Sequence, residues 1–183
     1  MSKRLSMVVD GRDHIQGRPD ARVTLVEYGD YECVHCGRAY LVVKALQRHL
    51  GAALRFVYRN FPLRELHPHA EAAARAAEAA AVQSKFWAMH DLLFENQRAL
   101  GASDLRRYAG ALSLDVSRWE RDFSSETLAA RVEQDLQSGL ESGVGGTPSF
   151  FIDGSRHEGG ADERSLLDAL ERAVRAPHLR AAT

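Results

Sequence analysis

Residues 23–36 read Val-Thr-Leu-Val-Glu-Tyr-Gly-Asp-Tyr-Glu-Cys-Val-His-Cys, and they predict the central part of the fold. Its first six residues form a short apolar, β-branched run that ends at Gly29, which predicts a buried strand. The two cysteines follow at once, and apolar residues then recur at helical spacing up to Leu50, before Gly51 stops the pattern. The sequence therefore predicts a strand that leads into a helix with a Cys-x-x-Cys motif at its start.

The segments on either side extend this unit into a sheet. Residues 54–59 read as a second strand, so that strand, helix and strand form a right-handed βαβ unit with parallel strands. Near the end of the chain, residues 149–152 and 155–158 predict two strands joined by an Asp-Gly turn. A last helix begins after Asp162, a helix-capping residue. The predicted order of the outer parts is βαβ followed by ββα.

The region between these halves is expected to be all helical. From His69 to Gln97 the chain lacks glycine and proline, and Val82, Phe86, Met89 and Leu93 fall on one helical stripe. Further helix starts are expected near Asp104, Asp115 and Glu126. The predicted organisation is an N-terminal half over 1–64, a helical insertion over 65–142, a C-terminal half over 143–176 and a tail over 177–183.

Composition narrows the class of protein. The chain has 183 residues, of which 45% are hydrophobic and 27% charged, as expected of one globular domain with an insertion. The net charge of -1 argues against a nucleic-acid partner. No stretch reaches the length of a membrane span. We expect a cytoplasmic protein from the sequence as written, or an extracytoplasmic one if a signal peptide has been removed.

The Cys33-Val34-His35-Cys36 motif points to thiol chemistry. At a helix start, unpaired N–H groups and the helix dipole stabilise a thiolate, the reactive form of cysteine. We expect Cys33 to be the attacking sulfur and Cys36, one turn later, the buried resolving sulfur. His35 favours the Cys33 thiolate, whereas the nearby carboxylates of Asp30 and Glu32 oppose it. The sequence leaves this balance open.

Glu27 and Pro148 can each be interpreted either as a functional residue or as an ordinary structural one. Glu27 lies in the apolar strand before the motif, where burial raises the pKa of a carboxyl and lets it accept the proton of the resolving thiol. The alternative is a side chain that points to water. Pro148 precedes the third strand, and a cis bond there leaves the Thr147 backbone free to pair with an extended substrate. The alternative is an ordinary trans proline.

Together these residues resemble the thioredoxin superfamily, and within it the DsbA-like thiol–disulfide oxidoreductases. The resemblance covers about residues 14–175. It rests on residues 23–28, the Cys-Val-His-Cys motif, Gly146-Thr147-Pro148-Ser149-Phe150-Phe151, and the insertion segments at 67–70 and 85–91. Val34 departs from the family, in which proline often follows the first cysteine.

The resemblance implies a thioredoxin fold with a helical insert and a redox-active Cys33–Cys36 pair. It implies a cis peptide before Pro148, a buried acid at Glu27, and a substrate groove that includes Gly146, Thr147 and Pro148. It also implies extended or unfolded protein substrates and a separate recycling redox partner, with no cofactor and no metal. Many relatives are exported, and some are soluble domains joined to membrane transporters.

Other functions stay open at this stage. We expect oxidation of substrates to be favoured, with a cytoplasmic disulfide reductase or a redox-sensing regulatory domain as the alternative. Two subunits that pool their motifs around zinc or an iron–sulfur cluster are a further possibility, although a monomer is expected. A glutathione-dependent enzyme is disfavoured because Cys36 has no role in such chemistry. His67, His69 and His90 are interpreted as packing residues rather than metal ligands.

Overall fold

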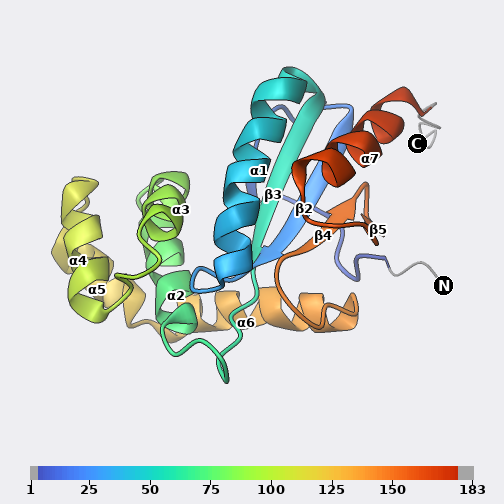
Figure 1. The fold of residues 1–183 in the computed structure, drawn as a ribbon. Coiled ribbons are helices and arrows are strands. Elements are labelled where there is room, and N and C mark those ends of the chain that lie inside the picture. Colours follow the sequence, from blue (N-terminus) through green and yellow to red (C-terminus); the bar gives the residue numbers. More distant parts are fainter. Residues whose placement is uncertain (1–3, 177–183) are drawn as a thin grey trace.

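A five-stranded mixed sheet forms the centre of the molecule in the computed structural model, which describes residues 4–176 (Figure 1). The strands lie in the order β1-β3-β2-β4-β5. The central pair, β2 and β3, is parallel, and the other neighbours are antiparallel. The strand bounds are β1 (His14–Gln16), β2 (Val23–Gly29), β3 (Leu54–Asn60), β4 (Ser149–Ile152) and β5 (Ser155–Arg156).

Helix α1 (Val34–Leu50) connects the parallel strands through the short 3-10 turn Gly51–Ala53. Gly51 has a φ of 51° and its N–H bonds to the Gln47 carbonyl, which is the helix stop expected from the sequence. Every residue of β2 is buried, as expected for a central strand covered on both faces. The predicted βαβ unit is therefore confirmed, and β2 delivers the chain directly to the two cysteines.

Helices cover both faces of the sheet. One face packs against α1 and α7 (Glu163–Arg175), whose buried Leu166 and Leu170 join the same core as Leu25. Asp162 caps α7 by accepting a hydrogen bond from Ser165 N–H. The other face carries Val26, Tyr28, Val57 and Phe151, and it packs against α6 and the segment that precedes β1. Both faces of β2 are thereby excluded from water.

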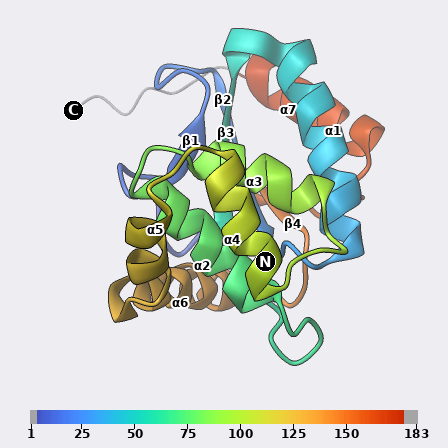
Figure 2. The same cartoon turned by 90° about the vertical axis from the view of Figure 1, so that its left-hand side faces the viewer.

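The helical insertion packs beside the sheet and shares its core (Figure 2). It comprises α2 (Ala70–Ala81), α3 (Phe86–Glu95), α4 (Ala102–Ala111), α5 (Val116–Phe123) and α6 (Glu126–Glu141). Helix α6 runs along the bottom of Figure 1, from the insertion to the second face of the sheet. The predicted α/β fold, with βαβ and ββα halves on either side of an all-helical insertion, is confirmed.

Three details differ from the sequence-based predictions. The helical run over 69–97 is broken between α2 and α3, because Ser84 has a φ of 60°. As a result, Val82 lies at the end of α2 with 42% of its surface exposed and does not join the buried stripe. The return strand over 155–158 pairs only at its first two residues. Strand β1 was not predicted, because three residues are too short for a periodic signal. The predicted tail over 177–183 lies outside the described residues.

Candidate active site

The two cysteines lie where β2 meets α1. Cys33 is the N-cap residue of α1, with extended backbone and no side-chain cap, and Cys36 lies in the first turn. The Cys33 thiol approaches the Thr147 carbonyl at 3.5 Å, and the Cys36 sulfur accepts a 3.4 Å hydrogen bond from the Asp30 N–H. Both are free thiols; Cys33 is 4% exposed and Cys36 is fully buried. The more accessible sulfur is the one predicted to attack.

The surroundings of the two thiols shift their pKa values in opposite directions. A hydrogen bond from Cys36 is the main cause that lowers the pKa of Cys33 to about 5; burial opposes this, while the backbone N–H groups of Cys36 and His35 assist. Burial raises the pKa of Cys36 well above its ordinary value, and the neighbouring Cys33 and Glu27 add to the rise. At neutral pH the reduced pair therefore holds a thiolate at Cys33 and a thiol at Cys36.

Glu27 is buried on β2, with only 2% of its surface exposed. Its Oε1 atom has no hydrogen-bond partner among the described residues. Burial, and to a smaller degree the charge of Cys33, raise the pKa of Glu27 to about 8. The alternative reading, a glutamate that points to water, is wrong. A carboxyl that is protonated near neutral pH thus lies close to the resolving thiol.

The loop before β4 faces the cysteines. The Thr147–Pro148 peptide bond is cis, and the Thr147 carbonyl is the group that contacts Cys33. Thr147 Oγ1 is buried and has no partner among the described residues. Gly146 has open space where a side chain would extend, and its carbonyl accepts a hydrogen bond from Ser149. A substrate role for these residues stays a prediction.

His35 is exposed, and it contributes to the site through its backbone N–H. The His35 N–H lowers the pKa of Cys33, whereas no interaction of the imidazole with either sulfur is found among the described residues. The predicted stabilisation of the thiolate by this imidazole stays a prediction.

The two carboxylates that were expected to oppose the thiolate are each paired with a histidine. His67 Nδ1 lies 2.8 Å from Asp30 Oδ2, and His69 Nδ1 lies 2.9 Å from Glu32 Oε1. The histidines belong to the loop between β3 and α2, so this loop is bound to the segment that carries Cys33. His90, by contrast, is buried in the insertion and contacts the Tyr31 hydroxyl at 3.1 Å. The three histidines do not converge.

Gln97 fixes the same segment from the helical insertion. Its side-chain amide donates to the carbonyls of Tyr31 (2.8 Å) and Cys33 (2.9 Å). Gly37 makes room for it, because a Cβ at that position would lie 2.1 Å from Gln97 Oε1. No local sequence pattern signals this contact, since the partners are 64 and 66 residues apart.

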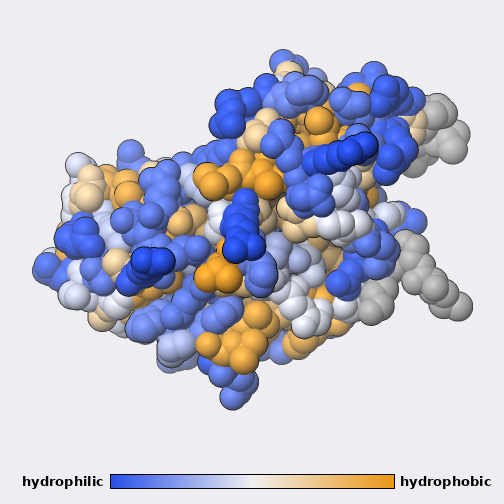
Figure 3. Space-filling view, in the orientation of Figure 1, coloured by the Kyte–Doolittle hydropathy of each residue, from blue (hydrophilic) through white to orange (hydrophobic). Residues whose placement is uncertain are grey.

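Apolar side chains surround the cysteines on the surface. Val34 is 62% exposed between them, and Leu66 is 72% exposed on the loop that carries His67. Figure 3 shows apolar side chains gathered over this loop, at the bottom centre of the view. Large exposed apolar groups of this kind are typical of surfaces that bind other proteins.

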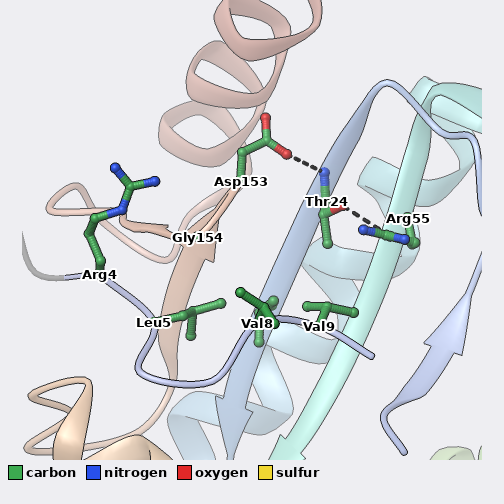
Figure 4. A pocket seen from close by; sticks show the side chains of 9 residues that line it. Arg4, Leu5, Val8, Val9, Thr24, Arg55, Asp153 and Gly154 are labelled. Carbon is green, nitrogen blue, oxygen red and sulfur yellow. Dashed lines mark hydrogen bonds between the residues drawn. The ribbon is translucent and has the colours of Figure 1, made fainter. Parts of the chain in front are cut away.

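A separate cavity of about 390 Å³ lies far from the sulfurs (Figure 4). It is enclosed by the segment over 4–9 and by the ends of β2, β3 and β4, where Asp153 accepts a hydrogen bond from Thr24 N–H and Arg55 donates to the Thr24 hydroxyl. Thr24 is near the opposite end of β2 from the cysteines, so this cavity is not part of the site. Among residues 4–176, no three His, Cys, Asp or Glu side chains are grouped to hold a metal ion.

Comparison with known proteins places the chain in a family. A family model described as thioredoxin matches residues 10–172. The chain belongs to the thioredoxin family. A solved thioredoxin-like oxidoreductase from Silicibacter pomeroyi DSS-3 is 31% identical, with a TM-score of 0.78 over 92% of this chain and 95% of that one. The oxidised BdbD structure from Bacillus subtilis shares the fold, at 22% identity and a TM-score of 0.84 over 96% and 98% of the two chains.

This thioredoxin-family chain is also similar to part of a larger protein. It is 45% identical over 162 residues to the Na(+)/H(+) antiporter NhaA 1 of Mycobacterium sp. (strain KMS). The match covers 87% of this chain but 26% of that protein, so the chain spans about a quarter of the length of such relatives. No helix within residues 4–176 is both long and apolar enough to cross a membrane. The prediction of an oxidoreductase of the thioredoxin superfamily is confirmed, and the DsbA-like fold is confirmed with it.

Proposed function

We propose that the protein exchanges disulfides with extended protein substrates through Cys33 and Cys36, and that oxidation of the substrate is favoured. The observation that carries the proposal is the asymmetry of the pair. Cys33 caps α1 with a pKa lowered to about 5, whereas Cys36 is fully buried with a raised pKa. Stabilising the Cys33 thiolate stabilises the reduced protein, and this makes its disulfide a stronger oxidant.

The oxidation of a substrate dithiol takes two exchange steps. A substrate thiolate attacks Cys33 Sγ of the Cys33–Cys36 disulfide, forms a mixed disulfide and releases Cys36, which takes up one proton. The second substrate thiolate then attacks the substrate sulfur of the mixed disulfide and releases Cys33 as a thiolate. The substrate has lost two electrons and two protons; the protein has gained both electrons and one proton, and the other proton goes to solvent.

Glu27 supplies a route for the proton that Cys36 takes up. Its carboxyl is protonated up to about pH 8 and lies in the buried environment that it shares with Cys36. We assign it as the general acid for the leaving Cys36 thiolate, and as the general base when the reaction runs in reverse. Thr147 and Gly146, beside Pro148, are assigned to the backbone of an extended substrate.

The proposal is tested with two single-cysteine variants. We expect Cys33→Ser to abolish both the oxidation of a reduced, unfolded protein and the reduction of insulin. Cys36→Ser should instead accumulate a mixed disulfide between Cys33 and the substrate, because the resolving thiol is missing. An active Cys33→Ser variant, or a trapped adduct on Cys36 in that variant, would overturn the assignment.

Similarity to part of an antiporter favours a second candidate, a redox-sensing domain that regulates a membrane transporter. The two candidates differ in turnover. An oxidoreductase oxidises many equivalents of a reduced substrate in the presence of a glutathione buffer. A sensor completes one exchange and changes its affinity for the transporter with its redox state.

A further inference from the structure

We propose that His67 is a positioning residue of this site, which holds the cysteine segment through Asp30 and takes up a proton when the Cys33–Cys36 disulfide is reduced. The inference rests on the proposed function, because it concerns the reduction of the same pair. Neither residue was assigned a role in the exchange from the sequence. Asp30 links this histidine to the sulfur of Cys36 and to the backbone of Cys33.

The buried Asp30 forms hydrogen bonds both with the cysteine segment and with the loop after β3. Its backbone N–H donates to the Cys36 sulfur, and its carbonyl accepts a 3.2 Å hydrogen bond from the Cys33 N–H. Its carboxylate accepts from Glu32 N–H and Leu63 N–H, at 2.8 Å each, as well as from His67. A shift of this carboxylate therefore displaces backbone groups that bond to both active-site residues.

The Asp30 carboxylate needs a positive partner. It is completely buried, and a buried charge without a counter-charge is costly. Two backbone N–H groups provide hydrogen bonds, but His67 is the only ionisable side chain found bonded to it among the described residues. A protonated His67 both satisfies this carboxylate and removes the negative charge that opposes the thiolate.

Three groups that face His67 favour its protonated form. Partial burial lowers the pKa of His67, but the hydrogen bond and charge of Asp30 outweigh this, and the charges of Cys33 and Glu32 add to the rise. Coupling between two sites is reciprocal. If the Cys33 thiolate favours the protonated imidazole, the protonated imidazole favours the thiolate by the same free energy.

The coupling alters the proton balance of the redox step. Two glutathione thiols supply two electrons to the disulfide and release two protons, while Cys36 takes one proton and Cys33 remains a thiolate. Near neutral pH, His67 takes part of the second proton that would otherwise reach the solvent. The reduction potential of the pair therefore falls more steeply with rising pH than one proton per two electrons requires, and its exchange constant with glutathione rises less steeply. Glu27 also faces Cys33 and contributes at the upper end of this range.

The chain offers a matched control in His69. It belongs to the same loop and also pairs with a carboxylate through Nδ1, but its side chain is 50% exposed and its partner Glu32 is 20% exposed. His67 is 23% exposed and its partner is fully buried. Water screens the outer pair more strongly, so His69 should be coupled weakly to the sulfurs.

The test measures the exchange equilibrium with glutathione between about pH 6 and 8 for the unmodified protein, His67→Asn and His69→Asn. Asparagine keeps an N–H donor near the position of Nδ1 but carries no charge. We expect His67→Asn to be about three- to tenfold less oxidising at the acidic end, and its exchange constant with glutathione to rise more steeply with pH, because only Cys36 then takes up a proton. His69→Asn should remain close to the unmodified protein. The ultraviolet absorbance of the thiolate should show a raised pKa of Cys33 in His67→Asn alone.

A second measurement needs no substitution. An NMR titration of the His67 imidazole should give a higher pKa in the reduced protein than in the oxidised protein. The inference about His67 is wrong if its imidazole titrates identically in both redox states and the two variants behave alike. The proposed function still stands in that case, provided that the unmodified protein exchanges with glutathione. If the unmodified protein forms no disulfide that exchanges with glutathione, the proposed function itself fails.

Discussion

The charge state of one buried carboxyl links the stability of the protein to its chemistry. Glu27 keeps its proton up to about pH 8, whereas an unfolded chain loses it near the ordinary value of 4.5. Between these values the unfolded state binds fewer protons than the folded state, so rising pH favours unfolding. The site thus holds an acid that serves proton transfer at the expense of stability above neutral pH.

We predict that Glu27→Gln removes this pH dependence. In the oxidised protein, where Cys33 does not titrate and offset the effect, the free energy of unfolding should fall by roughly 2–4 kcal/mol between about pH 5 and 8, and the variant should lose most of that fall. Release of Cys36 should slow by about a hundredfold. Chemical denaturation at several pH values and stopped-flow exchange check both effects. The exposed Glu141→Gln serves as control; equal pH curves for Glu27→Gln and the unmodified protein would refute the assignment.

At the residue scale, local patterns identify the reactive groups but not their partners. The motif at residues 33–36 follows a strand and opens a helix, and the placement of Glu27 follows from its apolar neighbours. The pairing of Asp30 with His67 joins residues 37 positions apart through a loop whose path no periodicity encodes. Asp30 and Glu32 were therefore expected to oppose the Cys33 thiolate, whereas each has a histidine partner.

At the scale of elements, the contact between Gln97 and Gly37 joins the insertion to the first turn of α1. We predict that Gly37→Ala destabilises the protein by about 1–3 kcal/mol, because the added methyl group displaces Gln97 from two carbonyls. Once Gln97 is removed, the same change should be favourable by up to about 1 kcal/mol, since alanine is the better helix former.

A double-mutant cycle separates these effects. Denaturation of Gly37→Ala, Gln97→Ala and the combined variant should give an interaction energy of about 1–4 kcal/mol, the difference between the two costs of Gly37→Ala. Gly110→Ala on α4, where a methyl group meets no atom within 4 Å, is the control for helix propensity. Additive effects of Gly37→Ala and Gln97→Ala would show that the contact does not constrain the helix.

The bounds of the long elements could be predicted because their signals are local. Gly51 stops α1, and Asp162 begins α7. The break between α2 and α3 could not be predicted, because it has neither glycine nor proline and relies on Ser84 in the left-handed region. Tertiary packing of Phe86 and Met89 against the sheet core compensates for this unfavourable backbone conformation.

At the scale of the whole molecule, Arg59 attaches the N-terminal segment to the sheet. Its side chain is 1% exposed and forms a two-pronged ion pair with Asp13, at 2.7 and 3.0 Å. It also donates to the carbonyls of Met7 and Val8 and to the Tyr28 hydroxyl. The segment covers apolar residues of the second face of the sheet, Val26 and Val57 among them.

We predict that Arg59→Met destabilises the protein by about 3–5 kcal/mol, because it leaves the Asp13 carboxylate buried without its partner. The segment before β1 should then become sensitive to proteases. Arg55→Met, on the same strand but without a carboxylate partner among the described residues, should cost less than about 1 kcal/mol. Limited proteolysis and denaturation of both variants distinguish the two positions; equal losses would contradict a specific role for Arg59.

The architecture of the molecule could be predicted from the order of its elements, because only a few sheet topologies are compatible with a βαβ unit and a ββα unit on either side of a helical segment. The attachment of residues 4–13 could not, because it relies on separate polar contacts, such as those of Arg59 with the Met7 and Val8 carbonyls and of Ser6 with Ser142, instead of a pattern. The insertion was predicted as helical, yet its shared core with the sheet became visible only in the packing of Tyr58 with Phe86 and Phe94.

The equilibrium of the Cys33–Cys36 pair with glutathione is the sharpest test of the proposal that this site favours oxidation of its substrates. The lowered pKa of Cys33 and the raised pKa of Cys36 predict a disulfide donor, with a reduction potential between about −120 and −180 mV. A potential near about −270 mV, the value of a reductase, would contradict the claim that this site favours oxidation.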